Sequence, residues 1–141
     1  MQRDLIKSFN ELFDAFEFFK KNLKKAREKH EIELEVHRFE FIVDSFLKNI
    51  RLFLKEQSYN CVYPADCIKA AAKFGLIVSE NTLLEMLDDK YRISHLKNQN
   101  IPDEIYQRIK ARYTIILGRS FDKIKKFYLS DNSGKSKNKK D

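Results

Sequence analysis

Residues that break helices are scarce in this chain of 141 residues, which holds only three glycines and two prolines. A β-sandwich or β-barrel needs a turn after each short strand, and this chain has too few turn-forming residues to supply them. The length suits one domain with one hydrophobic core. We therefore expect an all-α fold made mostly of long helices.

Apolar residues recur every three or four positions in four long segments and one short one, which places them on one side of a helix. The first segment runs from Leu5 to about Glu28. The second has a continuous stripe of Val36, Phe39, Val43, Phe46, Ile50 and Phe53. It has a second apolar side of Phe41, Ile42, Leu47 and Leu52. A helix that is apolar on two sides must be covered on both, so this one is either central or shared with another copy.

The short helix is predicted to begin at Pro64 and to close at Gly75, which suits the left-handed residue after a helix. Ser79 is expected to cap a fourth helix that runs toward His95. The last long helix opens at Pro102, and Gly118 inside it indicates a bend or a close helix contact. Its inward residues are expected to be Ile105, Ile109, Tyr113, Ile116, Ile124 and Phe127.

Basic residues exceed acidic ones by 28 to 21, which gives a net charge of +7. We assign residues 1–130 to the helical bundle and residues 131–141 to a flexible basic tail, because the tail has no apolar residue whose burial could offset its ordering entropy. The basic excess permits a polyanionic partner such as RNA. Mixed charges at 35% of the residues are equally typical of any soluble helical bundle.

The chain lacks the signatures of several protein classes. No apolar run approaches the roughly 20 residues that span a bilayer, so we expect a cytoplasmic protein with no membrane partner. There is no glycine-rich phosphate loop and no H-E-x-x-H motif, so we expect no cofactor and no metal. Cys61 and Cys67 have five residues between them and no nearby histidine, which fits neither zinc nor redox pairs, so we expect free thiols.

Four separated motifs are similar to those of one protein family. They are Arg38-Phe39-Glu40-Phe41, the segment from Pro64 to Ile77, Leu84-Glu85-Met86-Leu87-Asp88-Asp89 followed by Ser94-His95, and Glu104-Ile105-Tyr106-Gln107-Arg108-Ile109-Lys110. In this order and spacing they resemble the nucleotidyltransferase substrate-binding protein family of the HEPN superfamily. The resemblance covers roughly Leu5 to Tyr128.

The resemblance implies an up-and-down antiparallel bundle of four main helices plus one short helix, which forms a homodimer. It also implies a partner, a minimal nucleotidyltransferase that acts as the antitoxin-like half of a toxin–antitoxin pair. In active members, an arginine and a histidine separated by four to six residues meet across the dimer cleft and cut RNA without a metal. In some members, a tyrosine two places after the histidine is adenylylated by the nucleotidyltransferase, which silences the toxin.

This chain departs from the family pattern at three positions. Lys90 matches the arginine, Tyr91 replaces the polar residue that usually follows it, and Lys97 matches the modified tyrosine. We therefore expect no adenylylation at Lys97, and Tyr91 is the nearest alternative acceptor. Only Ser94 and His95 stand as the family has them.

A cation for catalysis has two possible sources. Arg92 lies three residues before His95 and could share its helix face, and Lys90 could act as a point charge. The catalytic candidates are thus Lys90, Arg92, Ser94 and His95. In the alternative structural interpretation, His95 caps the last carbonyl groups of its helix and Lys90 pairs with Asp88 or Asp89.

Two functions compete. The first is a HEPN-type subunit that binds a minimal nucleotidyltransferase in a toxin–antitoxin type module and carries a degenerate ribonuclease motif. The alternative is a metal-independent endoribonuclease, in which His95 takes the proton of a ribose 2′-hydroxyl and a nearby cation stabilises the phosphate. In both cases we expect a symmetric homodimer built on the second and fourth helices, with Phe41 and Leu52 at the interface.

Overall fold

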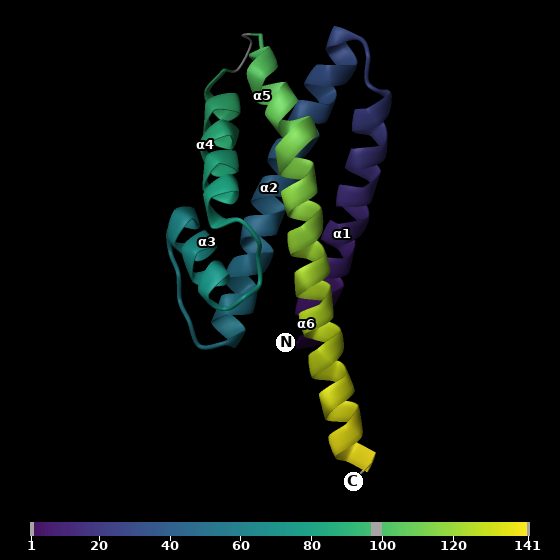
Figure 1. Cartoon of the computed structure of the whole chain (residues 1–141), viewed down its shortest axis with the longest axis vertical. Coiled ribbons are helices and arrows are strands. Elements are labelled where there is room, and N and C mark those ends of the chain that lie inside the picture. Colours follow the sequence, from purple (N-terminus) through teal and green to yellow (C-terminus); the bar gives the residue numbers. More distant parts are fainter. Residues whose placement is uncertain (1, 97–99, 141) are drawn as a thin grey trace.

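The computed structural model describes residues 2–96 and 100–140, and every regular element in these ranges is helical. The elements are α1 (Gln2–Lys25), α2 (Lys29–Glu56), α3 (Pro64–Lys73), α4 (Glu80–Leu96), α5 (Asp103–Arg108), the π-helical turn η1 (Ile109–Tyr113) and α6 (Thr114–Lys140). Figure 1 shows α5, η1 and α6 as one continuous column. This column and α1, α2 and α4 are the four main helices that the sequence predicted, and α3 is the short one.

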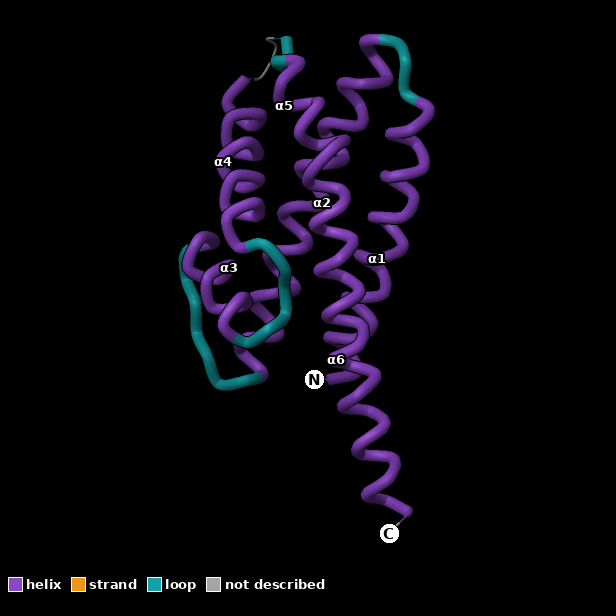
Figure 2. The backbone as a smooth tube through the Cα atoms, in the orientation of Figure 1, coloured by secondary structure: helices purple, strands orange, loops and turns teal. Residues whose placement is uncertain are grey.

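The four main helices run up and down beside one another. Figure 1 shows α3 and α4 on one side of α2, with α1 on the other. The connecting loops lie at the ends of the helices, as Figure 2 shows. Because α2 contacts α1, α3 and α4, it is the central helix of the bundle. The predicted stripe of α2 is fully buried, from Val36 to Phe53.

An aromatic cluster joins three of the main helices. Phe121 of α6 is fully buried, and its ring lies 4.8 Å from Phe16 and 5.8 Å from Phe9 of α1, measured between centroids. Phe46 of α2 meets the same ring edge to face at 5.6 Å. Such tilted and edge-on pairs are the arrangements that aromatic quadrupoles favour. The cluster therefore fixes α6 against both α1 and α2.

One irregular turn changes the register of the last column. A π-helical turn holds one more residue than an α-helical turn, so it shifts the phase of everything that follows. After η1 the buried apolar residues are Leu117, Phe121, Ile124 and Tyr128, whereas the sequence predicted Ile116, Ile124 and Phe127. Ile124 is therefore confirmed and Ile116 is partly buried, but Phe127 is exposed, so the prediction is wrong at Phe127.

The predicted helix ends are partly confirmed. Pro64 begins α3, and Gly75 has a φ of 76° just after it. A Cβ atom on Gly118 would lie 3.8 Å from the ring of Phe16, which confirms a close helix contact there. Ser79 precedes α4, but its hydroxyl donates a 2.7 Å hydrogen bond to Thr82 Oγ1 instead of accepting one from the backbone.

The prediction of free thiols is wrong, because a disulfide joins Cys61 to Cys67. The loop after α2 folds back against the first turn of α3 and brings the two Cα atoms to 5.4 Å, a separation that a disulfide can span. Sequence spacing alone does not reveal this return of the chain.

The C-terminal end of α6 extends past the rest of the bundle (Figure 1). Its backbone is helical as far as Lys140. The domain boundary at residue 130 and the flexibility of the 131–141 tail stay predictions. No helix in the described ranges is long and apolar enough to cross a membrane.

Candidate functional site

The four catalytic candidates lie on the last turns of α4, beside the middle of α2. Their side chains point in different directions. The side chain of Lys90 is only 15% exposed and faces α2, whereas that of Arg92 is 65% exposed. Ser94 and His95 are both exposed. Lys97 lies outside the described residues, so its expected role stays a prediction.

Lys90 forms an ion pair with α2. Its Nζ atom lies 2.8 Å from Oδ1 of Asp44 and 5.1 Å from the centre of the Tyr91 ring. The sequence had suggested Asp88 or Asp89 as its partner, and that suggestion is wrong because Lys90 points across to the neighbouring helix. The ammonium group that matches the family's arginine therefore ties α4 to α2.

Ser94 makes a second link between the same two helices. Its hydroxyl lies 2.9 Å from Oε2 of Glu40 and 3.0 Å from the carbonyl oxygen of Lys90, and it can donate to either. The other carboxylate oxygen, Oε1 of Glu40, lies 3.1 Å from Nδ1 of His37. His37 is exposed. Ser94 thus has a structural partner and need not act in chemistry.

His95 caps a carbonyl group of its own helix. Its Nδ1 atom lies 2.8 Å from the carbonyl oxygen of Tyr91. Because a carbonyl oxygen only accepts, Nδ1 must carry the proton, and in the neutral ring Nε2 is then the free acceptor. The hydrogen bond to Tyr91 confirms that His95 caps a carbonyl group of its own helix, as the structural interpretation expects. The second ring nitrogen, Nε2, could still act as a base.

Arg92 makes only a long contact, with 3.5 Å between its Nη1 atom and Oδ1 of Asp89. In the residues that the structure describes, no hydrogen bond or ion pair joins it to His95. The structure therefore gathers the four candidates on one helix without assembling a phosphate clamp.

Sequence reasoning missed the strongest polar group of the site, the buried carboxylate of Asp89. Asp89 is 1% exposed. The guanidinium group of Arg108 in α5 donates twice to it, from Nε to Oδ2 at 2.7 Å and from Nη2 to Oδ1 at 2.9 Å. The hydroxyl of Tyr113 in η1 donates to the same Oδ2. The sequence did contain a sign of this burial, because the spacing of Met86, Asp89 and Ile93 places all three on the same, buried side of α4.

These contacts keep Asp89 ionised. Burial by itself raises the pKa of Asp89, but the hydrogen bonds from Arg108 and Tyr113 outweigh it and hold the pKa below its usual value. Burial, followed by the hydrogen bond to Asp89, raises the pKa of the Tyr113 hydroxyl, so it stays a donor. The network therefore acts as a fixed anchor between α4 and the α5–η1–α6 column.

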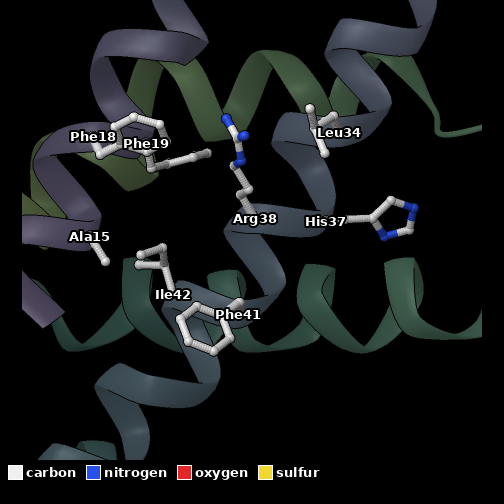
Figure 3. Close-up of a pocket in the computed structure, with 8 residues that line it drawn as sticks. All are labelled: Ala15, Phe18, Phe19, Leu34, His37, Arg38, Phe41 and Ile42. Carbon is white, nitrogen blue, oxygen red and sulfur yellow. The ribbon is translucent and has the colours of Figure 1, made fainter.

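Three exposed large apolar side chains line one pocket between α1 and α2. Phe18, Leu34 and Phe41 are 57%, 50% and 64% exposed and line a pocket of about 350 Å³. Figure 3 shows Phe18 and Phe19 of α1 facing Arg38, Phe41 and Ile42 of α2 around it. We call Phe18, Leu34 and Phe41 the α1–α2 apolar face. The other predicted interface residue, Leu52, is 38% exposed and lies further along α2.

Comparison with known proteins gives one family. Residues 5–126 match the family model described as "Nucleotidyltransferase substrate binding protein like". No curated protein matches the chain.

We predict that Asp89→Asn lowers the free energy of unfolding by about 3–5 kcal/mol, because it breaks an ion pair whose carboxylate is buried and leaves the partly buried guanidinium of Arg108 without its counter-charge. Urea denaturation at neutral pH measures the loss. Asp88→Asn is the matched control, since Asp88 is exposed, and it should change stability by about 0.5 kcal/mol or less. Equal effects of the two substitutions would contradict this role of Asp89.

The same network predicts how stability depends on pH. A carboxylate whose pKa is lowered by folding contributes stability that is complete above its unfolded pKa of about 3.9 and is lost as pH falls through the folded pKa. The wild-type protein should therefore lose stability below about pH 4 more steeply than Asp89→Asn.

Proposed function

The chain belongs to the nucleotidyltransferase substrate binding protein family, and we propose that it is a non-catalytic subunit that binds a minimal nucleotidyltransferase. The two proteins would form a toxin–antitoxin type module in the cytoplasm. The observation that carries this proposal is the state of the ribonuclease motif. The cation at the arginine position, Lys90, is paired with Asp44 and is largely buried.

The other charges around the motif support the same conclusion. Arg92 makes a long ion pair with Asp89, whose charge is already neutralised by Arg108. Ser94 is hydrogen-bonded to Glu40, which adds a carboxylate beside the position where a phosphate would have to bind. A negative group at that position repels an RNA phosphate, so the site is better suited to holding α4 against α2 than to cutting RNA.

We further propose that the subunit is a symmetric homodimer, with Phe41 and Leu52 of α2 at the interface. Its support is the α1–α2 apolar face, since a soluble monomer rarely exposes several large apolar side chains side by side. A second copy that packs its own α1–α2 apolar face against this one would cover Phe41 in both chains. A stable dimer should bury roughly 1,200 Å² or more in total.

The alternative function, a metal-independent endoribonuclease, is favoured by one observation. Among the described residues, none is hydrogen-bonded to Nε2 of His95 at the exposed end of α4, and Arg92 on the same helix is largely exposed. In this mechanism Nε2 would take the proton of the 2′-hydroxyl, Arg92 would stabilise the growing charge on the phosphate, and His95 of the second copy would protonate the leaving oxygen.

Binding to the nucleotidyltransferase tests the proposed function directly. We expect the chain to form a stable complex with the minimal nucleotidyltransferase encoded beside its gene, with equal numbers of the two proteins, in size-exclusion chromatography with light scattering. A minimal nucleotidyltransferase from an unlinked gene is the control and should elute separately. Failure of the neighbouring protein to bind at micromolar concentration would sink the proposal.

The dimer has its own test. The wild-type chain should sediment as a dimer at micromolar concentration, and Phe41→Asp should sediment as a monomer because it places a charge in the apolar interface. Tyr63→Asp is the matched control, since Tyr63 is 69% exposed and lies at the start of α3, away from the α1–α2 apolar face. A monomeric wild-type protein, or a dimer that survives Phe41→Asp, would contradict the proposed interface.

A further inference from the structure

A second depression lies at the far end of α2 from the α1–α2 apolar face. It has a volume of about 510 Å³ and runs between the last turns of α2 and the loop that leads to α3. Lys48, Arg51 and Lys55 of α2 form one wall, and Tyr59 and Val62 of the loop belong to the other. Leu52, the second proposed interface residue, also lines the groove, so the dimer interface and the groove would adjoin at this residue. We call this depression the basic groove.

The lining of the basic groove is positively charged. Lys48, Arg51 and Lys55 line it, and none of its lining residues is an aspartate or a glutamate. Within the described parts of the chain, none of the three forms an ion pair. Lys90 and Arg108, by contrast, are both paired. Three uncompensated cations on one wall make a site for an anion.

The end of α2 explains only one of these cations. A basic residue in the last turn of a helix offsets the negative end of the helix dipole, and Lys55 occupies that turn. The dipole effect is confined to about one turn, so it does not reach Lys48. From Lys48 to Lys55 the charges extend about 10 Å along the axis, a length that suits a chain of phosphates better than a single ion.

The opposite wall is held in place. Ser58 has a φ of 63°, and the backbone N–H of Tyr59 donates to the carbonyl of Leu54 at 2.8 Å, which turns the chain sharply after α2. The disulfide from Cys61 ties the loop to α3. The exposed ring of Tyr59 packs on Phe74 with 6.1 Å between centroids and an angle of 76°. An aromatic ring is thus fixed opposite the row of cations.

We infer that the basic groove binds single-stranded nucleic acid. Lys48, Arg51 and Lys55 would contact successive phosphates, and Tyr59 would stack on a base, which is how proteins without sequence preference hold single strands. The inference does not depend on binding of a nucleotidyltransferase. It also places nucleic acid on a different part of α2 from Glu40 and Asp44, the residues that hold the end of α4.

Fluorescence anisotropy with a labelled oligouridylate tests the inference. The groove variant Lys48→Gln, Arg51→Gln, Lys55→Gln should bind at least about tenfold more weakly at low salt, and its slope of log affinity against log salt should be shallower by about 2, at about 0.7 per lost phosphate contact. Tyr59→Ala should weaken binding about fivefold or more through lost stacking.

A second set of cations supplies the matched control. Lys20, Lys24 and Lys110 border a smaller pocket of about 110 Å³, where Lys20 is already paired with Glu17 at 3.0 Å. Replacing these three with glutamine removes the same charge and should leave the salt slope nearly unchanged. Sedimentation of both triple variants should match that of the wild type, so that a change of assembly is not mistaken for a lost contact.

Several results would overturn the inference. The first two are that the wild-type protein does not bind the oligouridylate at low salt, or that the two triple variants lose equal affinity for it. The other two are that Tyr59→Ala binds it as tightly as the wild type, or that the wild type binds a duplex of the same length equally well. Competition by ATP as strong as competition by unlabelled oligouridylate would also overturn it, because it would identify a mononucleotide site. A loss confined to the groove variant and Tyr59→Ala would support it, whether or not the nucleotidyltransferase binds.

Discussion

The buried carboxylate of Asp89 is the constraint on which the geometry of the candidate site depends. A charge that is 1% exposed is tolerated only because Arg108 and Tyr113 satisfy both of its oxygens. Their donors come from α5 and η1, so the carboxylate fixes α4 against the α5–η1–α6 column. Once α4 is fixed there, its other side faces α2, and Lys90 and Ser94 meet Asp44 and Glu40. The π-helical turn belongs to the same arrangement, because it contains Tyr113.

Local sequence patterns predicted most of the fold, and long-range contacts account for what they missed. The buried stripe of α2 and the start and end of α3 follow from spacing and from single residues with strong preferences, such as Pro64 and Gly75. The core residues after η1 followed only in part. Ile124 was assigned correctly, but Phe127 was assigned to the core in place of Tyr128, because an extra residue in one turn leaves no local mark in the sequence. The disulfide of Cys61 depends likewise on how a loop returns to α3.

In the candidate site, too, the sequence predicted the local features and missed the contacts between helices. The sequence placed Lys90, Ser94 and His95 together on one helix, and the hydrogen bond of His95 to its own helix was among the interpretations it offered. It could not reveal that α2 supplies acidic partners. Those partners change the chemistry, since a lysine paired with a carboxylate no longer offers a free positive charge to a phosphate. The family resemblance supplied the motif, and the tertiary contacts show that two of its residues are engaged with α2. The exposed side of α2 then carries an apolar surface around Phe41 and a basic one around Arg51, and Leu52 belongs both to the proposed interface and to the lining of the basic groove.

The most direct measurement of whether this chain binds rather than cuts is RNA cleavage by the purified wild-type protein in EDTA, compared with His95→Ala. His95 is exposed at a helix end, so its replacement should cost no more than about 1 kcal/mol of stability and the variant is a fair comparison. The account predicts that wild type and His95→Ala degrade RNA at the same background rate. Cleavage that persists in EDTA and disappears in His95→Ala would contradict it and establish the endoribonuclease.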